Sequence, residues 1–142
     1  IKAFVYDGFE RSLRGMIRDR CYQNVGKERS FRAGSYGGYG AFRSALCKAA
    51  LNMNVDEFWT QCRKDQQAQW DKPFYELLNF ADNEGSIGPE ACADLAEDFI
   101  NHELLVVGFL EAEHGETWFT QSYKEWKEAF ISTANSGCVY FC

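Results

Sequence analysis

The sequence predicts a helix-rich α+β fold with a small β-sheet, built as a single domain over residues 1–142. Three observations lead to this prediction. A length of 142 residues is typical of one domain, and no linker, repeat or low-complexity tract divides the chain. Short segments typical of strands stand near its two ends, at 2–6 and 138–142. Between them, most apolar residues recur at helical spacing.

The first elements alternate between strand and helix. Polar and apolar residues alternate over 2–6, which favours a strand, and a turn follows. The next segment, 10–22, is expected to be a helix with arginines on its polar face, and 23–29 a loop. The apolar residues of the expected helix recur every four positions: Leu13, Ile17 and Cys21.

Two helices are expected in the next part of the chain. The first covers 41–51 and follows a stretch rich in glycine and aromatic residues at 30–40. Asn54 is expected to cap the second helix, because Glu57 stands three residues later as in a capping box. This second helix should run to about Lys64.

The second half contains one weakly patterned segment and two long helical patterns. We assign 73–80 as a strand and 81–88 as a loop. Pro89 suits the first residue of a helix, and Gly115 is expected to end it. The last helix covers about 116–134 and leads to the terminal strand.

The composition favours a cytoplasmic protein that does not contact membranes. Aromatic residues make up 16% of the chain, enough to fill a core without disulfides, so we expect the six cysteines to be reduced. No apolar run approaches the ~18 residues that a membrane helix needs, and no signal peptide is visible.

The charge is spread unevenly. Residues 1–48 hold 10 basic and 4 acidic side chains, whereas 49–142 hold 5 basic and 17 acidic ones, for a net charge of −6. This asymmetry indicates a region that faces anions on an acidic body, or two parts that attract each other in the fold. The overall acidity argues against binding to long nucleic acid.

The first candidate binding segment is Phe31–Arg43, FRAGSYGGYGAFR. Its glycines allow tight turns, and it opens onto a helix N-terminus, which attracts phosphate. Its arginines could pair with phosphate, its first glycine and its serine could donate hydrogen bonds, and its tyrosines could stack on a base. The residues assigned to these roles are Arg32, Gly34, Ser35, Tyr36, Tyr39 and Arg43.

Known phosphate-binding patterns do not fit this segment. No Gly-Lys-Ser/Thr follows, as a P-loop requires, and Arg43 stands where G-x-G-x-x-G needs its third glycine. The alternative interpretation is a glycine-rich turn with structural tyrosines.

The second candidate is the acidic loop Asp82–Pro89, in which Asp82, Glu84 and Ser86 could accept hydrogen bonds from ribose or base donors. It fails the EF-hand pattern, because glycine falls at position 4 instead of 6 and Ala93 stands at position 12. The alternative interpretation is a loop that caps the helix beginning at Pro89.

The sequence indicates no catalytic residue, cofactor or metal. His102 and His114 are the only histidines, and His102 lies on an apolar stripe. No C-x-x-C and no G-x-S-x-G occurs, so neither a zinc site nor a serine nucleophile is expected.

These segments resemble a family of uncharacterised small proteins found in bacteria and their phages. The resemblance covers Phe31–Arg43, 73–99 and 123–141, and its most specific parts are RAGSY-x-GY and D-x-EG-x-IGP. The family loop usually opens with serine and the family chain ends in V-D-F-H, whereas this chain has Ala81 and Cys142 there. The resemblance supplies a provenance and not a mechanism, because no activity is assigned to the family. Small phage proteins of this size often act against host defences, so by analogy we expect an accessory protein in the host cytoplasm.

We therefore expect a protein that sequesters, without catalysis, a phosphate-bearing, nucleotide-like small molecule, such as an immune signal. The two alternatives are a module that inhibits a host protein and a metal-assisted nucleotide hydrolase using Asp82 and Glu84. Homo-oligomerisation is compatible with each of them.

Overall fold

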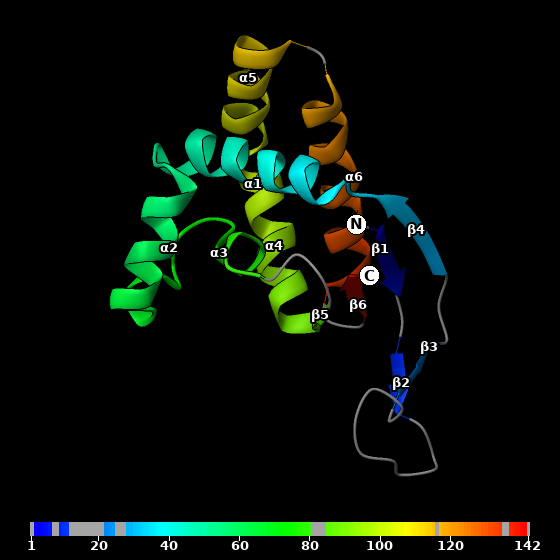
Figure 1. The fold of residues 1–142 in the computed structure, drawn as a ribbon. Helices are drawn as coiled ribbons and strands as arrows, with labels where there is room; N and C mark the ends of the chain where they lie inside the picture. The colour runs from blue at the N-terminus through cyan, green and yellow to red at the C-terminus, as the bar shows by residue number, and fades with distance from the viewer. Residues whose placement is uncertain are drawn as a thin grey trace.

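A computed structural model gives the arrangement of the chain and confirms the helix-rich α+β fold with a small sheet (Figure 1). It describes residues 2–6, 9–11, 22–24, 28–80, 85–115, 117–134 and 137–141. Within these ranges no helix is long and apolar enough to cross a membrane.

A four-stranded antiparallel sheet joins the two ends of the chain. Its strands are β4 (Glu28–Arg32), β1 (Lys2–Tyr6), β6 (Cys138–Phe141) and β5 (Gly85–Ile87), in that order across the sheet. Both predicted terminal strands are confirmed, and they pair centrally, with Ala3 opposite Phe141. The segment Gly85–Ile87 was expected to be loop. It becomes a strand because it pairs with β6.

The two faces of the sheet differ. Because side chains alternate along a strand, Ala3 and Val5 of β1 share one face with Val139 and Phe141 of β6, and all four are buried. The opposite face carries Phe4 and Tyr140, which are partly exposed. The buried face packs against helices, so the sheet closes one side of the core.

A second, two-stranded sheet projects beyond the first (Figure 1). It pairs β2 (Phe9–Arg11) with β3 (Tyr22–Asn24). The helix expected over 10–22 is wrong at both of its ends, which pair with each other as strands, and residues 12–21 lie outside the described residues. Likewise, parts of the expected loop 23–29 belong to β3 and β4.

Six helices of the described chain surround the core. They are α1 (Tyr36–Leu51), α2 (Val55–Lys64), α3 (Tyr75–Leu78), α4 (Pro89–Asn101), α5 (Glu103–His114) and α6 (Trp118–Thr133), with a short 3-10 turn, η2 (Gln67–Gln69), after α2. Helices α4 and α6 pack side by side and contact β6, and α6 also contacts β1. Helix α1 contacts α5, α2 and α3.

Three predicted helix boundaries are confirmed by their capping residues. The Asn54 side chain accepts a hydrogen bond from the amide of Asp56 at the start of α2. Pro89 opens α4, and Gly115, with φ +71°, ends α5. These signals act within one helical turn, so the sequence alone reveals them.

Helix α1 starts five residues earlier than expected. The Ser35 side chain accepts a hydrogen bond from the amide of Gly38 at 3.1 Å, which caps a helix beginning at Tyr36. Three of the four glycines of the segment therefore lie inside the helix. Only Gly34, with φ +110°, adopts a conformation that requires glycine.

The strand assigned to 73–80 is wrong, since the segment forms the short helix α3. Phe74 precedes it with φ +63°, and the carboxylate of Asp98 accepts a hydrogen bond from the Phe74 amide at 2.9 Å. The expected single helix from Pro89 to Gly115 is also wrong, because the chain breaks at His102, where φ is −106° and ψ is 9°. Both departures depend on contacts between distant segments.

Four of the six cysteines lie in the described residues, and all four are free and buried: Cys47, Cys62, Cys92 and Cys138. The expectation of reduced thiols is confirmed for these four.

Candidate functional site

A hollow lies where α1, α2 and the end of α3 meet. Its volume is about 650 Å³, within the usual range for small-molecule sites. Both charged and aromatic side chains reach it. Its lining includes Arg43, Trp59, Arg63, Gln66, Asn79 and Phe80. We call it the arginine cavity.

Arg43 forms the inner wall of the arginine cavity. This residue is only 5% exposed, and its Nη1 donates a hydrogen bond to the carbonyl of Phe80 at 2.6 Å. Its guanidinium group lies 4.6 Å from the ring centre of Tyr39 and 5.4 Å from that of Trp59. The rings and the carbonyl therefore hold a buried cation in place at the cavity.

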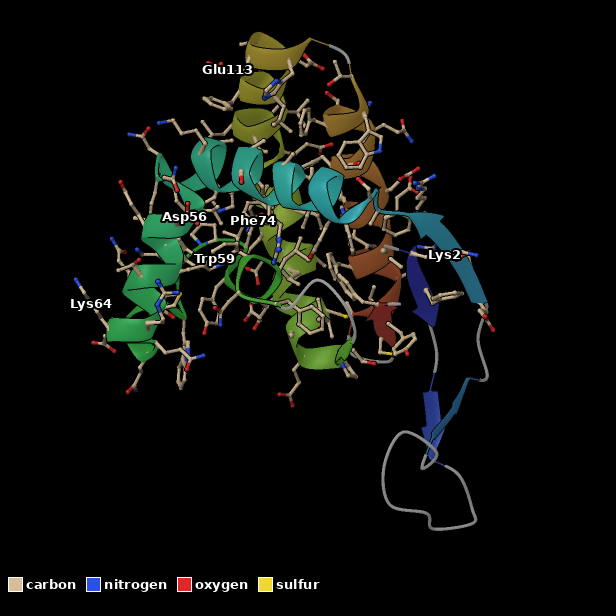
Figure 2. All side chains as sticks on the ribbon, viewed as in Figure 1. Lys2, Asp56, Trp59, Lys64, Phe74 and Glu113 are labelled. Atoms are coloured by element: carbon tan, nitrogen blue, oxygen red, sulfur yellow. The ribbon has the colours of Figure 1, made fainter. Side chains whose placement is uncertain are left out.

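Trp59 forms the neighbouring part of the wall. Its indole Nε1 donates a hydrogen bond to the carbonyl of Leu78 at 2.9 Å, which ties the last residue of α3 to α2, while Arg43 of α1 binds Phe80 just beyond that helix. Trp59 lies on the side of α2 that faces α3, whereas Lys64 lies on the outer side (Figure 2). Arg63 follows Trp59 by one helical turn and lines the same cavity, and its Nη2 donates a hydrogen bond to the Thr60 hydroxyl at 3.2 Å.

Two cations act on the Cys62 side chain in the wall of the cavity. Cys62 also lines the cavity, and burial raises its pKa. Lys72 and Arg63 lower that pKa and so act against the burial. A thiolate in this wall would be attracted to both cations, and a ligand phosphate would meet the same field.

A second hollow of about 300 Å³ adjoins the first and shares Gln66, Asn79 and Phe80 with it. We call it the side cavity. Its other walls include Ser86 of β5 and Glu76 of α3, and burial raises the pKa of Glu76. The amides of Gln66 and Asn79 both donate to the hydroxyl of Tyr75, at 2.8 and 3.2 Å, which fixes the boundary between the two cavities.

The structure brings together parts of the two predicted segments. Arg43 from the first segment lines the arginine cavity, and Ser86 from the second lines the side cavity. Phe80 lines both, accepts from Arg43, and lies 3.0 Å from the point where a Cβ on Gly85 would stand. The two segments therefore meet at Phe80.

Other predicted residues lie away from these cavities. Ser35 caps the N-terminus of α1, whereas α2 follows the C-terminus of that helix. Arg32 is exposed on the edge strand β4. A Cβ on Gly34 would stand only 2.9 Å from the ring of Trp118, so this glycine serves close packing.

The tyrosines and the acids differ in what the structure shows of them. Tyr39 is fully buried, with its ring near those of Trp126 and Phe141. It contacts the guanidinium group of Arg43 and does not line either cavity. The side chain of Tyr36, like the whole of Asp82 and Glu84, lies outside the described residues.

Sequence reasoning missed most of the cavity wall. Trp59, Arg63 and Gln66 were not singled out. Trp59 and Arg63 lie on one side of α2 because one helical turn separates them, and this spacing was the available signal. Gln66 lies beyond the end of α2, so helical spacing does not place it. In the described ranges, no group of three or more histidine, cysteine, aspartate or glutamate residues is placed to hold a metal ion.

Comparisons with known proteins identify no relative. No family model matches the chain, and neither a curated protein nor a solved structure matches it.

Proposed function

We propose that this protein binds a phosphate-bearing, nucleotide-like small molecule in the arginine cavity and the adjoining side cavity, and holds it without chemical change. The observation that carries the proposal is that two arginines and a tryptophan line one hollow of about 650 Å³. Arg43 and Arg63 would neutralise phosphate, and Trp59 would offer its face to a base.

The side cavity supports the same ligand class. The side-chain amides of Gln66 and Asn79 supply hydrogen-bonding groups at the boundary between the cavities. These groups suit sugar hydroxyls and base edges, since a few polar groups in a partly apolar site fix a ligand's orientation. The two adjoining volumes also accept a ligand longer than a single phosphate.

The resemblance to small phage proteins makes a nucleotide signal of host defence the first ligand to test. Sequestration requires affinity and slow release, and a buried arginine held by three groups is pre-organised for both. No step of this proposal uses a nucleophile or an acid–base pair.

Thermal-shift screening tests the proposal. The protein is melted with mono-, di- and cyclic nucleotides, with and without Mg²⁺. A ligand at 100 times its dissociation constant should add about 2.7 kcal/mol to the free energy of unfolding. The bound ligand, released by heat and identified by mass spectrometry, should be unchanged. A released product would show an enzyme, and no shift with any nucleotide would refute the proposal.

A matched pair of variants locates the site. Arg63→Gln removes a cation from the arginine cavity, whereas Lys64→Gln removes the neighbouring cation from the outer side of α2. The ligand-induced shift should fall in the first variant and persist in the second. Equal shifts in both would place the ligand elsewhere.

One observation favours the alternative of a protein-interaction module. Helix α5 exposes Leu104 and Leu105, which are 93% and 59% accessible, and large exposed apolar side chains often mark interfaces. On this alternative, no nucleotide raises the melting temperature, and Leu104→Glu abolishes binding to a purified host protein without loss of folding.

A further inference from the structure

The face of the four-stranded sheet that points away from α4 and α6 is partly exposed among the described residues, since Lys2 and Tyr140 are exposed, whereas Cys138 is buried. One row crosses all four strands on this face: Ser30, Phe4, Tyr140 and Ser86. Both serines are exposed, and Tyr140 is 38% exposed. The two rings therefore stand in the middle of the row, with only small side chains beside them.

The two rings are close neighbours. The ring centres of Phe4 and Tyr140 lie 6.3 Å apart with an angle of 41° between their planes. Both side chains project from the central strands β1 and β6, so paired backbone on both sides holds them in position. Rings displayed in this way offer a fixed stacking surface.

Two cations border the rings. Lys2 and Arg32 stand opposite each other on β1 and β4, on the same face as the rings, and both are exposed. The Lys2 ammonium lies 5.1 Å from the ring centre of Phe4. Among the described strand residues of this face, the one acid is Glu28, at the other end of β4. The cations thus form the next row along β1 and β4, beside Phe4 and Ser30.

We infer that this face binds single-stranded nucleic acid, with Phe4 and Tyr140 stacking on bases and Lys2 and Arg32 contacting the backbone phosphates. Single strands present exposed base faces next to phosphates, and this chemistry matches rings next to cations. A duplex hides its base faces, and the acidic remainder of the chain would repel a long polyanion. The occupant is therefore a short single strand. This inference does not depend on the proposed small-molecule site.

Fluorescence anisotropy tests the inference directly. The probe is a fluorescein-labelled oligothymidylate of about ten nucleotides, a length within the range that single-strand sites cover. The whole chain should bind it at low salt. Two phosphate contacts predict a slope of about −1.4 in log affinity against log salt concentration.

The variants separate stacking from charge. Tyr140→Ala should weaken binding about five- to a hundredfold, as expected for the loss of one stacked base. Tyr140→Leu keeps apolar bulk on the strand and should weaken binding similarly, which guards against an unfolded alanine variant. Lys2→Gln combined with Arg32→Gln should lower the affinity and flatten the salt dependence. Lys64→Gln, on the far side of the molecule from Lys2, should bind as the parent does (Figure 2).

Each of three results would overturn the inference. The first is no anisotropy change with the parent protein at low salt. The second is equal affinity in the parent and both Tyr140 variants. The third is displacement of the probe by inorganic polyphosphate as effectively as by unlabelled oligothymidylate. That result would mean that the binding depends on charge without base stacking. Arg63→Gln, a change in the arginine cavity, should not affect this binding, so the two sites are tested separately.

Discussion

Replacing glycines in the segment 34–40 tests how that segment is built. A Cβ added to Gly40 would meet nothing within 4 Å, and the residue lies in the second turn of α1. Alanine is more stable than glycine in a helix by about 1 kcal/mol, so Gly40→Ala should stabilise the protein by roughly this amount. For a chain of this size the melting temperature should rise by about 3 °C.

The same substitution at Gly34 should have the opposite effect. Gly34 has φ +110°, and an added Cβ would stand 2.9 Å from the ring of Trp118. Backbone strain of this kind costs about 1–3 kcal/mol, and the ring must also shift. Urea unfolding followed by tryptophan fluorescence measures both variants. Destabilisation by Gly40→Ala would contradict the placement of Gly40 inside a helix that begins after Ser35. No effect of Gly34→Ala would contradict the positive φ and the close packing of Gly34.

Three further predictions concern buried groups. Arg43→Leu should lower the free energy of unfolding by at least about 2 kcal/mol, since it removes a charge-assisted hydrogen bond to Phe80 and two ring contacts; an unchanged urea midpoint would contradict this. Burial raises the pKa of Asp98, so the stability linked to its protonated form is lost as the pH rises through the folded-state pKa. Asp98→Asn, which can still accept from Phe74, should therefore be the more stable protein at neutral pH, and its advantage should vanish on acidification in melts across pH. Burial raises the pKa of Cys47 to about 11, so its thiol should not react with iodoacetamide near neutral pH while the protein is folded. Mass spectrometry should find the Cys47 peptide alkylated only after unfolding. Rapid labelling of the native protein would contradict this expectation.

The sequence predicted the features that depend on neighbouring residues. Asn54, Pro89 and Gly115 mark helix ends through hydrogen bonds or backbone angles within one turn, and each was placed correctly. The terminal strands were also recognisable, because their alternation reflects one buried and one exposed face.

The features that were missed depend on distant partners. The strand Gly85–Ile87 exists because β6 pairs with it, and the helical turn after Phe74 is held by Asp98, 24 positions away. The break at His102 has no proline or glycine to announce it. A pattern within a short window does not contain this information.

The candidate site divides in the same way. Arg43 was singled out because it ends a distinctive segment, but its partner Phe80 is 37 positions away. Trp59 and Arg63 belong to the site because α2 packs near α1 in the fold. The carbonyls of Leu78 and Phe80 accept hydrogen bonds from Trp59 of α2 and Arg43 of α1, and only the folded chain shows these bonds. The roles predicted for Asp82 and Glu84 stay predictions, since both lie outside the described residues.

The central claim is that cations of the arginine cavity hold the phosphate of a nucleotide-like ligand. Isothermal titration of the parent, Arg63→Gln and Lys64→Gln with the nucleotide that gives the largest thermal shift tests it most directly. Arg63 and Lys64 are adjacent and carry the same charge, but only Arg63 lines the cavity. The account predicts an affinity at least about tenfold weaker for Arg63→Gln, the loss of one charged hydrogen bond, and parent-like affinity for Lys64→Gln. Equal affinities in all three proteins would contradict it.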